Sequence, residues 1–339
     1  MKIIHTADLH LDSAINGLPE QKSKQRRDEI VKTFGRIIET AQKENAEAVL
    51  IAGDMFDEER ATRTTSEYVI SHIEKAAPIQ FYYMRGNHDK CTPFDENGIP
   101  SNLTIMGGGC DFVPLSDDIS LYAFSEDEKF DTAEFDRSKI NIVMYHGDIT
   151  PIVGKLAGKY IDYLALGHIH KRGEGKIDNR GIWVYPGCPN GRGYDECGEK
   201  SVEIIEIDGT GLKHSFAATS DRICHEIEIE TTEFEKTADL ADAVYEKTKD
   251  IKSADLVKIV FVGSIKDEIR TDAPDVTEKL NRFFGYRIVD NTEIATDNLG
   301  GGLSLAGKFA ELVEGDVSLN DNMKRLVLQY GLAALKGSK

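Results

Sequence analysis

The chain has 339 residues, of which 40% are hydrophobic and 29% charged, and its formal net charge is −18. This length suits about two domains, and the composition excludes a disordered chain. No apolar run approaches the ~18 residues that span a bilayer. Because His5 and Asp8 interrupt the first apolar run, a signal peptide is not expected, so we expect a cytoplasmic protein without a membrane partner. The negative charge by itself argues against a protein that coats nucleic acid, since phosphate binding is mostly electrostatic.

The first third of the chain alternates strand and helix patterns. Residues 2–7, 48–52 and 79–84 are strand-like, and 48–52 is a continuous apolar run typical of a strand buried on both faces. Residues 24–45 and 64–77 carry apolar side chains at three- and four-residue spacing, which predicts helices. This alternation implies crossover connections and a sheet covered by helices on both faces.

The middle of the chain is richer in strands, and the composition changes near residue 221. A hairpin turn is expected at 208–211, and a glycine cluster at 300–302 precedes two helix patterns. We therefore expect three parts, 1–220, 221–299 and 300–339. The further expected strands are 119–124, 140–145, 163–166, 182–185, 202–207, 223–229, 256–262 and 284–289, and the further expected helices are 238–249, 303–313 and 320–335.

Five short polar clusters each directly follow a strand-like run. Because ligands bind at the carboxyl ends of strands in layered α/β folds, all five loops could converge at one edge. Most of these clusters would be ordinary turns if they occurred alone, but their joint occurrence in this order points to a shared site. The clusters are Asp8-Leu9-His10, Gly53 to Asp57 (GDMFD), Gly86 to Asp89 (GNHD), His146-Gly147 and Gly167 to His170 (GHIH).

The residue types in these clusters suit divalent metal ions. Together they supply aspartates, an asparagine and several histidines, and no thiolate. A mixed shell of oxygen and imidazole ligands suits Mn²⁺, Fe²⁺ or Zn²⁺. Seven ligands are too many for one ion and about right for two that share a carboxylate. Two ions roughly 3.5–4 Å apart can clamp the phosphate oxygens of an in-line displacement.

The chain carries, in order, the motifs DxH, GD, GNHD and GHxH, with a separate histidine between the last two. This ordered set resembles the signature of the calcineurin-like metallophosphoesterases over about residues 1–215. The resemblance implies an α/β fold, a two-sheet sandwich flanked by helices, here followed by a small α+β capping domain and C-terminal helices. It also implies a binuclear metal centre. Asp57 stands where several nuclease relatives carry histidine, so its role is left open.

The resemblance assigns roles to the matching positions. His88 would bind no metal; it would lie beside the scissile phosphate, stabilise charge in the transition state and protonate the leaving oxygen. Asp89 would orient His88 by a hydrogen bond. The implied ligands are Asp8, His10 and His170 for the first ion, Asn87, His146 and His168 for the second, and Asp54 as the bridge between them.

Narrower features resemble one branch of the family, the SbcD/YhaO-type DNA repair exonuclease subunits. The start of the chain, MKIIHTADLHLDS, is similar to SbcD-type subunits, and residues 303–335 are similar to YhaO-like exonucleases. This resemblance implies exonuclease action on double-stranded DNA ends, with endonuclease action on hairpins or single strands, through attack of a metal-bridging hydroxide. It further implies Mn²⁺ as the metal, an SMC-like ATPase of the SbcC type as partner, and a homodimer.

Two alternatives remain open. A small-molecule phosphodiesterase or phosphatase could use the same core, although the segment after residue 221 is more than a pocket enzyme needs. A non-catalytic scaffold would be expected to have lost ligands, and all seven positions are filled. Charge does not exclude DNA, because residues 117–136 carry eight acids and one lysine, whereas 151–192 carry seven basic residues and three acids.

Overall fold

The computed structural model describes residues 1–57, 61–90, 92–107, 111–125, 127, 129–266, 268–294 and 304–337. The chain divides into two compact units, Met1–Ile223 and Cys224–Lys339. The division into three parts expected from the sequence stays a prediction. The glycine cluster at 300–302 lies outside the described residues.

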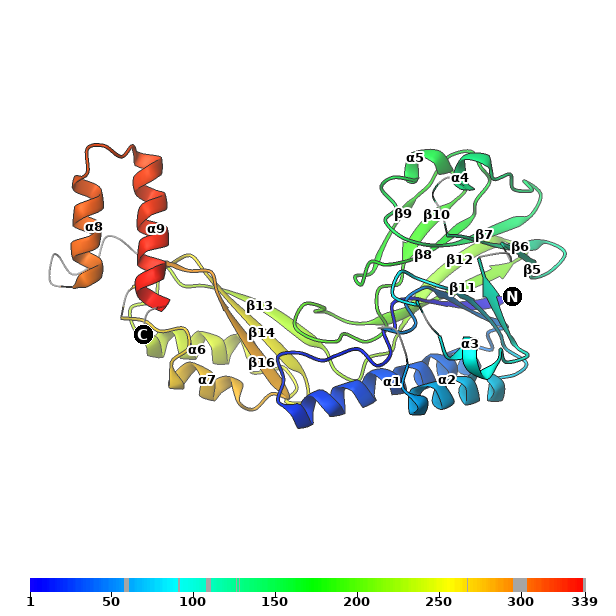
Figure 1. The fold of residues 1–339 in the computed structure, drawn as a ribbon, viewed down its shortest axis with the longest axis horizontal. Coiled ribbons are helices and arrows are strands. Elements are labelled where there is room, and N and C mark those ends of the chain that lie inside the picture. Colours follow the sequence, from blue (N-terminus) through cyan, green and yellow to red (C-terminus); the bar gives the residue numbers. More distant parts are fainter. Residues whose placement is uncertain are drawn as a thin grey trace. The chain divides into compact units, whose positions relative to one another are not determined.

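The first unit contains two six-stranded sheets, and Figure 1 labels the strands β5 to β12. In the first sheet, β1 to β4 run parallel to one another, and β11 pairs antiparallel with β1. Strands β11 and β12 form the expected hairpin, with Asp208 opposite Gly211. The order of this sheet is β12 (Gly211–Ala218), β11 (Ser201–Asp208), β1 (Lys2–Thr6), β2 (Ala48–Ala52), β3 (Gln80–Met84) and β4 (Leu103–Met106).

The second sheet has a parallel centre and two antiparallel edge strands. Its edge strand β9 was not expected, because its sequence Gly-Glu-Gly-Lys has no strand pattern; it forms by pairing with β10. The order is β5 (Phe112–Pro114), β6 (Ile119–Phe124), β7 (Ile140–His146), β8 (Tyr163–Gly167), β10 (Ile182–Tyr185) and β9 (Gly173–Lys176).

Strands β1, β2 and β3 of the first sheet are buried on both faces because alternate side chains enter different cores. On β2, Leu50 packs in the core between the two sheets, whereas Val49 and Ile51 pack against helices. Those helices are α1 (Glu20–Lys43) and α2 (Arg63–Lys75). Helix α1 begins at Glu20, four residues before the start at residue 24 that the sequence predicts, because its first turns are polar and give no apolar periodicity. The short helices of this unit are α3 (Pro93–Asn97), α4 (Lys129–Thr132) and α5 (Val153–Leu156).

Together, the two sheets and their helices confirm the predicted two-sheet α/β sandwich. Because β1, β2 and β3 are parallel, the loops that follow them leave the first sheet at one edge, and β7 and β8 place their loops together in the second sheet. The five polar clusters occupy these loops.

The second unit is built on the parallel sheet β13–β14–β16, with one helix between each successive pair of strands. Among the described residues, no helix combines the length and apolar character needed to cross a membrane. The elements are β13 (Cys224–Glu230), α6 (Thr237–Thr248), β14 (Leu256–Val262), β15 (Ser264–Ile265), α7 (Pro274–Leu280), β16 (Gly285–Asp290), β17 (Glu293–Ile294), α8 (Leu305–Gly315) and α9 (Asp321–Gly337).

Candidate metal centre

The loops after β1 and β2 lie side by side and present aspartates and a histidine to the same point. The backbone N–H of Asp8 donates to the carbonyl of Gly53, and that of His10 donates to the carbonyl of Asp54, both at 3.0 Å. Asp8, His10 and Asp54 all have positive φ, of 54°, 45° and 49°. Such conformations cost of order 1–3 kcal/mol each and cluster at functional sites. The fold therefore holds these three residues in strained backbone conformations.

Asp54 is buried and contacts groups from three other loops of the site. Its Oδ1 accepts the backbone N–H of His88 at 2.8 Å. Its Oδ2 lies 3.2 Å from His146 Nε2 and 3.8 Å from His10 Nε2. One carboxylate thus faces histidines that come from opposite sides of the site.

The orientation of His146 is set by the main chain. Its Nδ1 donates to the carbonyl of Ala52 at 2.8 Å, and because a carbonyl only accepts, the lone pair of the neutral ring is on Nε2. That Nε2 faces Asn87 Oδ1 at 3.0 Å. Gly53 and Gly167 border the ring, and a Cβ on Gly167 would lie 2.6 Å from His146 Nδ1. Both positions therefore need glycine for His146 to reach the site.

The GHIH loop closes the site from the second sheet. The backbone N–H of His168 donates to both carboxylate oxygens of Asp8, at 2.9 and 3.1 Å. Burial raises the pKa of Asp8, while the nearby imidazoles and this N–H oppose the shift. The Nε2 of His170 lies 3.0 Å from the Nε2 of His10. On the far side of its ring, His170 Nδ1 lies 2.7 Å from Glu196 Oε1, which leaves the Nε2 lone pair facing His10.

The spacing of these donor atoms fits metal ions. Two ligands about 2.1 Å from an ion and at right angles to one another are about 3.0 Å apart. The pairs His10 Nε2–His170 Nε2 and His146 Nε2–Asn87 Oδ1 both have this separation of 3.0 Å. Two imidazole lone pairs that face one another repel unless a cation lies between them. Among the described residues, three groups of donor atoms are able to hold an ion: Asp8, His10 and His170; Asp8, Asp54 and His146; and His10, Asp57 and His88.

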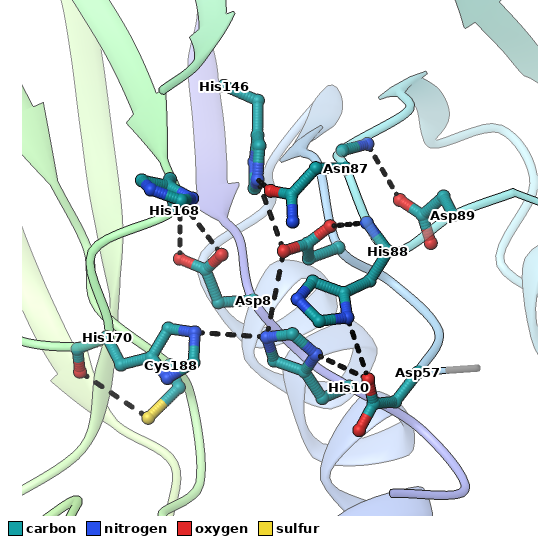
Figure 2. A network of polar contacts seen from close by, with 12 residues as sticks. Asp8, His10, Asp57, Asn87, His88, Asp89, His146, His168, His170 and Cys188 are labelled. Carbon is teal, nitrogen blue, oxygen red and sulfur yellow. Dashed lines mark hydrogen bonds and ion pairs between the residues drawn. The ribbon is translucent and has the colours of Figure 1, made fainter. Parts of the chain in front are cut away.

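The carboxylate beside the ring of His88 belongs to Asp57, not to Asp89. His88 is 48% exposed, and its Nδ1 lies 3.0 Å from Asp57 Oδ1. Asp89 is buried and accepts three backbone N–H groups instead, from Met55 at 3.2 Å and from Phe56 and Gly86 at 2.9 Å. Figure 2 shows the Asp89 carboxylate turned away from the His88 ring. The expectation that Asp89 orients His88 is therefore corrected: Asp89 ties two loops together, because its three donors come from both.

Asp57, left open by sequence reasoning, contacts two of the predicted site residues. Besides His88, its Oδ1 lies 3.6 Å from His10 Nδ1, and its Oδ2 accepts the hydroxyl of Ser13 at 2.7 Å. The imidazole of His10, followed by Ser13 and Arg192, holds the pKa of Asp57 well below its ordinary value against the effect of burial. Glu196 was missed altogether, because it is 26 residues from His170 and no motif marks it.

A model of the calcineurin-like phosphoesterases matches residues 1–172, about half of the chain, and the chain belongs to this family. It is similar to "Uncharacterized metallophosphoesterase YhaO" of Bacillus subtilis, with 26% identity over 78% of this chain and 72% of the relative. It is also similar to "DNA double-strand break repair protein Mre11" of Methanosarcina acetivorans, with 29% identity over 63% of this chain. That match spans only 38% of the Methanosarcina protein.

A solved structure titled a dimetal phosphatase, from Danio rerio, aligns with 65% of this chain and 99% of its own at 10% identity. Its TM-score is 0.44. Family membership agrees with the donor set, since phosphoesterases of this family use divalent metal ions. The match ends two residues after His170 and therefore includes all of the predicted ligands but neither Arg192 nor Glu196.

Proposed function

We propose that this chain is a binuclear-metal phosphodiesterase that cleaves DNA, acting as an exonuclease on double-stranded ends with endonuclease activity besides. The observation that carries the proposal is the convergence of imidazole, carboxylate and amide donors at about 3 Å spacing, with lone pairs directed inward. Two clamped divalent ions suit an in-line displacement at the phosphorus of a phosphate ester.

The proposed ligands are those expected from the sequence: Asp8, His10 and His170 for the first ion, Asn87, His146 and His168 for the second, and Asp54 for both. Two divalent ions, proposed as Mn²⁺, would activate a water molecule and neutralise charge on the phosphodiester. His88 is proposed as the residue that touches the substrate. Its Nδ1 faces Asp57 and holds one proton there, so only the imidazolium form, with a second proton on Nε2, would donate a proton to the leaving oxygen.

DNA is the proposed substrate because relatives of this chain carry DNA repair names. Several basic residues of the segment 151–192 are paired within the chain. Arg172 lies 2.6 Å from Glu203, Arg180 lies 2.8 Å from Asp162, and Lys155 pairs with an aspartate at 3.0 Å. The net positive charge of residues 151–192 is therefore not an open phosphate-binding surface. We expect weak, salt-sensitive DNA binding by this chain alone.

An SMC-like ATPase of the SbcC type is proposed as the partner that holds the duplex. Helix α9 has an exposed apolar stripe at helical spacing, formed by Met323, Leu326, Val327 and Tyr330. This stripe is separate from the residues that pack α9 against α8. We propose that it docks on the coiled coil of the ATPase, and L326E is expected to abolish co-purification of the two proteins. A homodimer is proposed from the same family resemblance, to be tested by light scattering.

The function is tested by measuring cleavage of linear plasmid DNA and hydrolysis of bis-p-nitrophenyl phosphate, both with Mn²⁺. We expect H88N to lose DNA cleavage by about 100-fold or more, the size of a general-acid contribution, while it keeps its bound metal. Turnover of the small ester should fall less, because p-nitrophenolate leaves without a proton. The matched control is H225Q, since His225 pairs with Asp255 in the second unit. Ester turnover with no DNA cleavage, even with the ATPase added, would refute the nuclease.

A further inference from the structure

The outer nitrogen of His170 is held by a buried carboxylate, which in turn is held by an arginine. Glu196 is 9% exposed, and its Oε1 lies 2.7 Å from His170 Nδ1. Arg192 donates to the same oxygen from Nε at 2.9 Å and from Nη2 at 2.7 Å. Its backbone N–H donates to Oε2 at 2.6 Å. We call Arg192 and Glu196 the Arg–Glu clamp.

The other end of the Arg192 guanidinium reaches a second carboxylate of the site. Its Nη1 lies 3.2 Å from Ser13 Oγ and 3.5 Å from Asp57 Oδ2. Asp57 in turn lies 3.6 Å from the outer nitrogen of His10. One guanidinium therefore holds both carboxylates that face the outer sides of His10 and His170, the two histidines proposed for the first ion.

The ligands proposed for the second ion have different supports. His146 is oriented by the carbonyl of Ala52, and the backbone of His168 is anchored on Asp8. Among the described residues, no hydrogen bond of Arg192 goes to Asn87, His146 or His168, the three ligands proposed for the second ion. The histidines of the two sites thus differ in their supports: side-chain carboxylates face the outer nitrogens of His10 and His170, whereas a main-chain carbonyl faces that of His146.

The clamp stands on a well-anchored loop. Arg26 of α1 is buried and donates to the carbonyl of Gly191 and to the side chain of Asn190. The side chain of Arg192 is itself 25% exposed, and its Nε, Nη1 and Nη2 all face acceptors within the chain. Few of its donors are left for a substrate phosphate, so positioning is the role that its geometry allows.

We infer that Arg192 is a positioning residue for the first metal site alone, acting on His170 through Glu196 and through its own Nη2, which lies 3.2 Å from His170 Nδ1, and acting on His10 through Asp57. This inference rests on the ligand assignment of the proposed function. Contacts of this kind contribute about 10- to 100-fold to metal affinity. Loss of the guanidinium should therefore weaken one of two bound ions by about that factor and leave the other unchanged.

The test is calorimetric titration of the metal-free full-length chain with Mn²⁺, together with electron paramagnetic resonance of the loaded protein. For R192M we expect one of two binding events to weaken by about 10- to 100-fold. At subsaturating metal, the spectrum of a magnetically coupled pair should give way to that of a single uncoupled ion. E196Q should weaken the same event.

The matched control is R180M, which removes the same charge at a similarly exposed position paired with Asp162. Its Mn²⁺ titration should match that of the wild type. If R192M does not fold, R192K takes its place, since lysine keeps the charge but cannot bridge both carboxylates, and it should weaken one event in the same way.

Equal weakening of both ions, or unchanged affinity in both R192K and E196Q, would overturn the inference. A wild-type chain that binds a single ion would overturn it together with the binuclear centre. A wild-type chain that binds two ions and cleaves no DNA would refute the proposed nuclease and leave the inference standing on the titrations.

Discussion

His5 gives the first unit a built-in sensitivity to acid that can be calculated. This side chain lies in β1, fully buried between the two sheets, with its Nδ1 3.0 Å from the hydroxyl of Tyr163. Burial lowers the pKa of His5 from 6.5 to about 3. The histidine therefore stays neutral in the folded protein at pH values where the unfolded chain takes up a proton.

Because this pKa is lower in the folded protein than in the unfolded chain, acid destabilises the fold. The free energy of unfolding is unaffected by His5 above pH 6.5, the pKa in the unfolded chain, and decreases as the pH falls toward about 3. Below pH 6 the loss is about 1.4 kcal/mol for each pH unit, which amounts to about 2 kcal/mol at pH 5 and to about 5 kcal/mol in the acid limit. The window between pH 5 and 7 lies above the range in which most carboxylates titrate.

The experiment compares the wild type with H5L by urea unfolding between pH 7 and pH 5, with a chelator present. The single tryptophan, Trp183, lies on β10 and reports on the first unit alone. At pH 7 we expect H5L to be less stable by about 1–3 kcal/mol, because the hydroxyl of Tyr163 loses its partner. At pH 5 this gap should have closed by about 2 kcal/mol.

Y163F is the control for the lost hydrogen bond. It removes the hydroxyl but leaves the histidine buried, so its stability should fall with pH as steeply as that of the wild type. Wild-type and H5L curves that run parallel from pH 7 to pH 5 would refute the assignment of the acid sensitivity to His5.

Three further predictions follow from single contacts. D89N should destabilise the first unit by about 2–3 kcal/mol, since an amide cannot accept all three backbone N–H groups; an unchanged melting temperature with lost activity would instead favour a catalytic role. G167A should lose Mn²⁺ affinity, measured by calorimetry, because its Cβ would overlap His146, whereas G154A, with open space around it, should not. Burial raises the pKa of the Cys188 thiol to about 12, so iodoacetamide at pH 8 should label Cys188 only after unfolding, as peptide mass mapping would show.

The sequence by itself determined that polar clusters follow successive strands and which residue types could meet there. The strand Ala48–Ala52 was predicted with its observed bounds, because a strand buried on both faces must be continuously apolar. Parallel pairing brings the ends of such strands to one edge, so loops far apart in the chain could be assigned to one site.

Only the tertiary structure decided which groups surround the predicted ligands. Asp89 follows His88 directly and was taken for its partner, but the tight loop turns the Asp89 carboxylate toward backbone N–H groups and leaves Asp57 beside the ring. Glu196 meets His170 across 26 residues, and Arg172, just after the GHIH loop, pairs with Glu203 on β11. Motifs encode residues that share a loop, whereas hydrogen bonds and ion pairs between loops depend on the packing of the whole sandwich.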